Sequence, residues 1–167
     1  GTWSPAIDNT QTTEYTFTPD EGQCAAVQTI TVVVGPPGTP TFDLISPICS
    51  GLNLSLPLVS IEGFTGTWSP AINNTQTTTY TFTADEGQCA LTAELSVEVL
   101  ENPIISAGDP IIVCVGDIAT LSGSGAGSGG NYTWDNGIED GISFTVTETT
   151  LYTVTGTDEN GCMGTAS

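Results

Sequence analysis

Five cysteines are the residues whose types and spacing most clearly imply chemistry in this chain. Cys24 and Cys89 lie 65 residues apart, as do Cys49 and Cys114, and Cys162 follows. The chain has no histidine and no CxxC pair, so the pattern indicates disulfides in an oxidising compartment rather than a zinc site. Because no cation or imidazole is present to stabilise a thiolate, a catalytic or redox-active cysteine is disfavoured.

The spacing favours two disulfides, Cys49–Cys89 and Cys114–Cys162, each closed within one 65-residue unit. Bonds between units, or free thiols, are the alternatives. Cys24 has no partner within the chain in this scheme, because its mate in the 65-residue register would precede Gly1. Closing a loop of this size contributes about 4 kcal/mol to stability in the chain-entropy account.

Three tryptophans could provide a platform for sugar rings, or could be the core tryptophans of a β-sandwich. Trp68 shares one face of an alternating segment with Gly66, while Thr67 and Ser69 share the other face, which favours the core interpretation. The predicted core aromatic residues are Trp3, Trp68, Trp134, Tyr15, Tyr80 and Tyr152.

The acidic turns could supply oxygen ligands to calcium, with Asp135, Glu139, Asp140 and Asp158 as candidates. Calcium takes six to eight oxygens, and the chain has no DxDxDG loop to gather so many in one place. Asp, Asn and Gly are also the residues that hairpin turns require. Turn formation is therefore the favoured role, and no cofactor is predicted beyond this calcium alternative.

The charge composition limits the partners and the activity. The chain has 19 acidic residues, no Lys, Arg or His, and a net charge of −19. Nucleic acid is excluded as a partner, because phosphate neutralisation needs Lys or Arg. No serine nucleophile with a basic partner and no cationic oxyanion site can be assembled, so an enzyme is not expected. No apolar run is long enough for membrane insertion.

The elements that must position these residues are β-strands. Tyr80 and Phe82 alternate with threonines, and Leu95, Val97 and Val99 alternate with Glu and Ser. A period of two marks strands with one buried and one solvated face, and no segment has apolar residues at helical spacing. Short strands separated by turns predict an all-β chain of immunoglobulin-like β-sandwich modules.

An internal repeat organises the chain. Residues 1–25 (GTWSPAIDNTQTTEYTFTPDEGQCA) and 66–90 (GTWSPAINNTQTTTYTFTADEGQCA) differ at three positions, and a diverged third copy places Trp134, Tyr152 and Cys162 in the same order. The predicted domains are 1–35, the C-terminal half of a module; 36–101, a complete module; and 102–167, a module lacking its last strand. We expect disulfide-stapled modules arranged end to end, each about 30 Å long, as an excised piece of a longer fibre.

The assembled features resemble the Ig-like and PKD-like tandem repeat modules of giant cell-surface adhesins of the Bacteroidota, including gliding-motility adhesins with SprB-type repeats. The motifs that carry the resemblance are Ile48-Cys49-Ser50-Gly51, Gly66-Thr67-Trp68-Ser69-Pro70, Tyr80-Thr81-Phe82-Thr83, Gly87-Gln88-Cys89, Tyr152-Thr153-Val154-Thr155 and Asp158-Glu159-Asn160-Gly161-Cys162.

The resemblance implies a structural stalk or filament that projects a binding tip and supports adhesion or gliding. It also implies export by type IX secretion, display at the cell surface through an outer-membrane anchor elsewhere in the protein, and neighbouring modules or surface glycans as partners. The alternative is that each module is itself a carbohydrate- or calcium-dependent binding domain.

Overall fold

The computed structural model describes residues 1–167 and contains thirteen short strands, one 3-10 turn and no α-helix. The elements are β1 (Thr2–Ser4), β2 (Thr13–Thr18), β3 (Gln28–Val32), β4 (Ile48–Cys49), β5 (Gly66–Ser69), β6 (Thr78–Ala84), β7 (Ala93–Val97), β8 (Val99–Leu100), β9 (Ile118–Thr120), β10 (Asn131–Trp134), η1 (Asp135–Gly137), β11 (Ser143–Thr145), β12 (Val154–Thr157) and β13 (Met163–Ala166). The prediction that the chain is all-β is confirmed.

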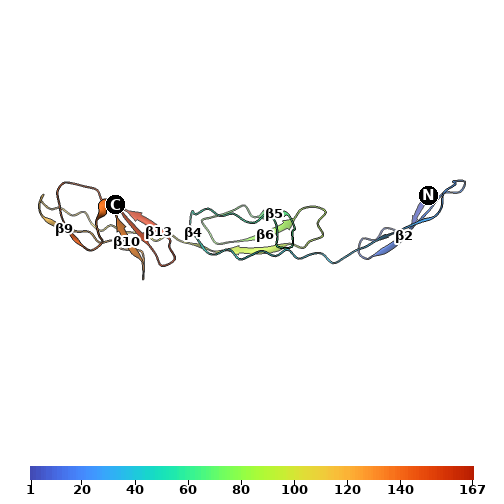
Figure 1. The fold of residues 1–167 in the computed structure, drawn as a ribbon, viewed down its shortest axis with the longest axis horizontal. Helices are drawn as coiled ribbons and strands as arrows, with labels where there is room; N and C mark the ends of the chain where they lie inside the picture. Colours follow the sequence, from blue (N-terminus) through green and yellow to red (C-terminus); the bar gives the residue numbers. More distant parts are fainter.

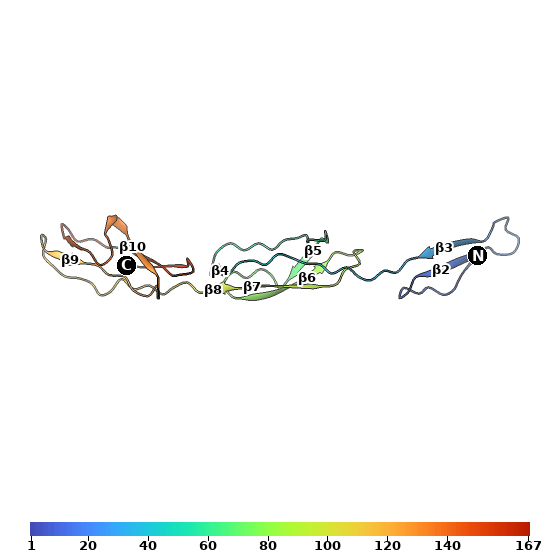
Figure 2. The same cartoon turned by 60° about the horizontal axis from the view of Figure 1, so that its bottom comes forward.

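The strands form three groups that follow one another along the longest axis of the molecule (Figures 1 and 2). We call β1–β3 the first group, β4–β8 the middle group and β9–β13 the third group. The N-terminus lies in the first group, at one end of the row, and the C-terminus lies within the third group (Figure 1).

The repeated sequence forms the same antiparallel sheet twice. In the first group the order is β1-β2-β3, with Trp3 opposite Phe17. In the middle group the order is β5-β6-β7, with Trp68 opposite Phe82. The third strands share one register, because Tyr15 faces Ile30 as Tyr80 faces Leu95.

The middle group has a second layer. Residues 38–60, here called the covering segment, lay Phe42, Ile45, Ile48, Leu54 and Leu56 against one face of the β5-β6-β7 sheet. Within this segment β4 pairs in parallel with β8. The covered face buries Tyr80, Phe82, Leu95 and Val97, each at most 4% exposed. Two packed layers around one apolar core are consistent with a β-sandwich.

Nothing in the structure covers the corresponding face of the first group. Ile30 and Val32 are 53% and 44% exposed, whereas Leu95 and Val97 at the same positions are 4% and 1% exposed. Trp3 is 52% exposed, so the prediction that Trp3 is a core residue is wrong in this structure. Its ring lies 5.3 Å from the Phe17 ring, measured between centroids, and the sheet has a single layer.

The third group contains two small sheets, β10-β12-β13 and β9-β11. Its core consists of Ile105, Ala126, Trp134 and Val154, so Trp134 is buried as expected, while Tyr152 is half-buried beside it. The end of the chain forms β13, which pairs with β12 and places Ala166 opposite Val154.

A buried tyrosine hydroxyl fastens the loop before β6. The Tyr80 hydroxyl donates to the Asn73 carbonyl at 3.0 Å and accepts from the Asn73 N–H at 2.9 Å. The first repeat forms the same pair of bonds between Tyr15 and Asp8. Tyr15 and Tyr80 are 6% and 0% exposed, as expected for core residues.

We expect Tyr80→Phe to lower the free energy of unfolding of the middle group by about 1–3 kcal/mol, because it leaves the amide and carbonyl of Asn73 without partners. Urea unfolding followed by tryptophan fluorescence measures the change. Thr79→Val is the matched control: it removes only an exposed 3.3 Å bond to Ser96, and should change stability by less than about 0.5 kcal/mol. Equal losses in the two variants would contradict the assigned role.

Candidate functional site

The one disulfide joins the middle group to the third group. Cys49 bonds to Cys162, 113 residues further along the chain, while Cys24, Cys89 and Cys114 are free and exposed. The predicted pairings Cys49–Cys89 and Cys114–Cys162 are therefore wrong in this structure. The expectation that Cys24 has no partner within the chain agrees with it.

The Cys49–Cys162 pairing is explained by where each cysteine lies along its strand group, because only cysteines at adjoining ends of two groups can meet. Cys49 is in β4, next to β8, at the end of the middle group that adjoins the third group (Figure 1). Cys89 lies at the opposite end, where its carbonyl accepts from Gly38 N–H at 2.7 Å just after the connection from the first group. Cys162 lies in the hairpin turn between β12 and β13, and its side chain is fully buried at the junction.

Each cysteine sits in one of two turn types. The first type is a turn closed by a hydrogen bond to an aspartate carbonyl, and the cysteine is the residue directly after it. Asp20, Asp85 and Asp158 accept these bonds in the turns before Cys24, Cys89 and Cys162 respectively. Cys49 and Cys114 open a turn closed by their own carbonyls, which accept from the N–H groups of Leu52 and Asp117. The Cys49–Cys162 bond thus joins one turn of each type across a junction.

The junction has a further polar contact that the sequence did not indicate. Asn102, in the connection between the two groups, donates from Nδ2 to the Ser50 carbonyl at 3.1 Å. The Ser50 N–H in turn donates to the Leu100 carbonyl at 2.8 Å. These bonds hold the connection against the turn that carries Cys49. A connecting asparagine has no pattern in the sequence that would mark it for this role.

The calcium candidates take part in local hydrogen bonds. Asp140 Oδ1 accepts from the Trp134 indole at 2.8 Å and from Gly123 N–H at 2.7 Å. Asp158 Oδ1 accepts from the amides of Asn160 and Cys162 inside its turn. Asp135 begins the turn η1, which Glu139 follows. No three acidic, Cys or His side chains come together in a way that could hold a metal ion.

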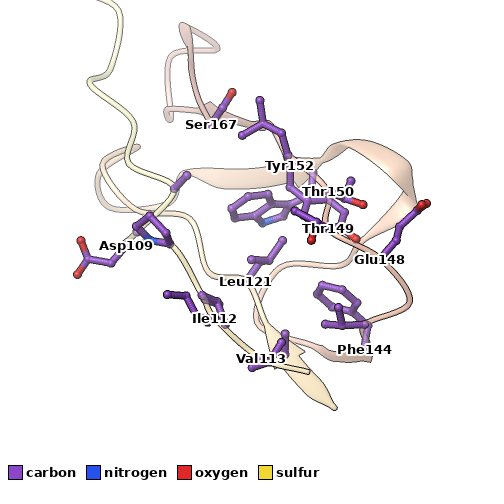
Figure 3. Close-up of a pocket in the computed structure, with 18 of the residues that line it drawn as sticks. Asp109, Ile112, Val113, Leu121, Phe144, Glu148, Thr149, Thr150, Tyr152 and Ser167 are labelled. Carbon is purple, nitrogen blue, oxygen red and sulfur yellow. The ribbon is translucent and has the colours of Figure 1, made fainter. Parts of the chain in front are cut away.

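A cavity of about 520 Å³ lies in the third group. Ile112, Val113, Leu121, Phe144 and Tyr152 line it, together with the threonines at 149 and 150 (Figure 3). The rim carboxylates Asp109 and Glu148 point away from it (Figure 3). The cavity is an apolar gap between residues 107–115 and the sheets, and it gathers no charged groups that could do chemistry.

One carboxylate anchors the covering segment at its N-terminal part. Glu62 accepts from the Thr41 N–H at 2.8 Å, from the Thr41 hydroxyl, and from the Ser60 hydroxyl at 2.9 Å. Hydrogen bonds from Thr41 lower the pKa of Glu62 from 4.5 to about 2. The bond from the Thr41 hydroxyl has the largest effect, and the bond from the Thr41 N–H comes next. The pKa of Asp8 is also lowered, chiefly by the Thr10 hydroxyl.

We expect Glu62 to make stability depend on pH between about 4.5 and 2. A folded-state pKa below the unfolded value gives a contribution that is present above pH 4.5 and lost as the pH falls toward 2. Urea midpoints measured across this range should fall less steeply for Glu62→Gln than for the wild type. Glu21→Gln removes an exposed carboxylate that accepts no hydrogen bond and should keep the wild-type slope. A wild-type slope in Glu62→Gln would contradict the assignment.

Neither a family model nor a curated protein matches the chain. The structure contains no helix with the length and apolar character needed to cross a bilayer. A disulfide between two strand groups is typical of proteins in oxidising compartments.

Proposed function

We propose that residues 1–167 are a spacer region of a secreted cell-surface protein, built from tandem immunoglobulin-like modules that hold a binding part away from the cell. The observation that carries the proposal is the Cys49–Cys162 bond, which joins two successive strand groups in a row instead of closing one group on itself. A covalent bond at a junction helps to preserve the direction of a row of small modules.

Several features support this proposal. The repeats at residues 1–25 and 66–90 build the same sheet in successive groups. The tyrosine that bonds back to the backbone before its strand is a feature of immunoglobulin-like sandwiches. An acidic surface without any Lys or Arg keeps neighbouring stalks apart by repulsion. The proposed family is the SprB-type, Ig-like and PKD-like repeats of exported Bacteroidota adhesins, and the proposed role is not catalytic.

Small-angle X-ray scattering of the 167-residue chain tests the spacer role. Three modules of about 30 Å each in a row give a maximum dimension of about 90 Å or more. A compact globule of this length would have a radius of gyration of about 15 Å. A measured radius of gyration near that value would overturn the proposal.

A further inference from the structure

The repeat supplies an internal comparison between a covered sheet and an uncovered one. The β1-β2-β3 and β5-β6-β7 sheets have nearly the same sequence in their first two strands and the same register throughout. On the third strand, Ile30 and Val32 stand at the positions of Leu95 and Val97. The first sheet nevertheless exposes about half of each of these side chains, whereas the second buries them.

The middle group shows which chemistry covers such a sheet. Phe42 packs on Trp68 and on Phe82, with ring centroids 4.7 and 4.8 Å apart. The Trp68 indole donates to the Pro57 carbonyl at 2.7 Å. The covering segment therefore brings an aromatic ring, a row of aliphatic side chains and a backbone acceptor for the tryptophan. Asp43 is its one charged residue, so it adds little charge to the apolar layer.

The covering segment also carries a cysteine to a defined place. Cys49 lies at the end of the middle group that faces the third group, and there it bonds to Cys162. A similar segment laid over the first group would carry a cysteine at the position that corresponds to Cys49. That cysteine would lie next to the end of the middle group that adjoins the first group, where Cys89 is free and exposed. Cys89 follows the same type of aspartate-closed turn as Cys162.

We propose that the uncovered face of β1-β2-β3 is a docking site for an extended apolar segment with the chemistry of residues 38–60, and that a cysteine at its Cys49 position forms a disulfide with Cys89. The inference goes beyond a spacer role, because it assigns a binding face to the first group and a disulfide-forming role to Cys89. Two observations carry it independently: the exposed apolar face with its covered counterpart, and the free thiol with its bonded counterpart.

The covalent step needs a small disulfide such as oxidised glutathione as the oxidant. The segment thiolate attacks it, forms a mixed disulfide and releases one glutathione thiol. The Cys89 thiolate then attacks the segment sulfur of the mixed disulfide, which forms the Cys89–segment bond and releases the second glutathione. One glutathione disulfide is reduced to two thiols, and two thiols become one disulfide.

The test uses the whole 167-residue chain and a synthetic peptide with the sequence of residues 36–65. In a glutathione redox buffer we expect a one-to-one adduct, which peptide mapping by mass spectrometry should place on Cys89 and not on Cys24 or Cys114. A peptide with Cys49→Ser should bind without forming the adduct, and calorimetry would measure its affinity.

Matched variants separate docking from random thiol exchange. Ile30→Asp should weaken binding of the Cys49→Ser peptide by about tenfold or more, because an apolar contact is replaced by a charge. Thr29→Asp places the same charge on the neighbouring exposed residue, on the opposite face of β3, and should leave binding unchanged. Both residues are exposed, so neither change disturbs a core.

Three results would overturn the proposal. One is an adduct spread evenly over the three free cysteines, and another is binding that Ile30→Asp leaves unchanged. The third is a dimer of the chain that Ile30→Asp dissociates and the peptide does not displace, since it would make a second copy the occupant. None of these results depends on whether scattering supports a row of modules, so failure of docking is distinguishable from failure of the spacer role.

Discussion

Phe82→Ala is expected to lower the free energy of unfolding of the middle group by about 3–5 kcal/mol. Phe82 is fully buried, and its ring lies 4.8 and 5.2 Å from the rings of Phe42 and Trp68. Removing it leaves a cavity at the contact between the two layers, and the cost combines lost burial with that cavity. Urea unfolding and hydrogen exchange of residues 38–100 would measure the loss.

The repeat provides an unusually close control for this change. Phe17 occupies the same register position in the first group, where Trp3 is the one aromatic ring next to it, and it is half-buried. Phe17→Ala should therefore cost about 1 kcal/mol or less, because no second layer encloses the ring. Equal losses at positions 17 and 82 would mean that the covering segment contributes little to stability.

Cys49→Ser is expected to destabilise the joined middle and third groups by about 4–5 kcal/mol. The bond closes a loop between residues separated by 113 positions, and in the chain-entropy account a loop of this length restricts the unfolded chain strongly. Urea midpoints of the oxidised wild type and of the variant would give the difference. The reducing agent TCEP should bring the wild type to the level of the variant.

Cys114→Ser is the matched control for the junction, because Cys114 lies in the same type of turn as Cys49 but carries a free thiol. Its stability should stay within about 0.5 kcal/mol of the wild type. If Cys49→Ser and Cys114→Ser behaved alike, the bond between the groups would not form in solution.

Local features of the fold could be predicted from the sequence. Alternation around Tyr80, Leu95 and Val97 placed the strands and their buried face, since one face of each strand needs an apolar partner. Trp3 and Trp68 stand at the same position of the sequence repeat, and in the structure they share the same strand register. These features depend on residues that are close together in the sequence or directly opposite in a hairpin.

The disulfide pairing could not be predicted, because it depends on the direction in which distant segments run. β4 lies parallel to β8, and this carries Cys49 to the end of the middle group opposite to Cys89. Spacing along the chain is the same whether a cysteine lies at one end of a group or at the other. The exposure of Trp3 escaped prediction for a related reason: strand alternation shows which face is apolar, but not what covers it.

The Cys49–Cys162 bond also determines how the chain would respond to mechanical load. A pull applied before residue 49 and after residue 162 travels through the sulfur atoms and bypasses the backbone of residues 50–161. While the bond is intact, that stretch cannot be drawn out. Once the bond is reduced, the segment between Cys49 and Cys162, which are 113 positions apart, is free to unfold. Its extension would lengthen the chain by roughly 400 Å, at about 3.3–3.6 Å per residue. The thiol–disulfide balance of the surroundings would thus decide whether this region is stiff or extensible.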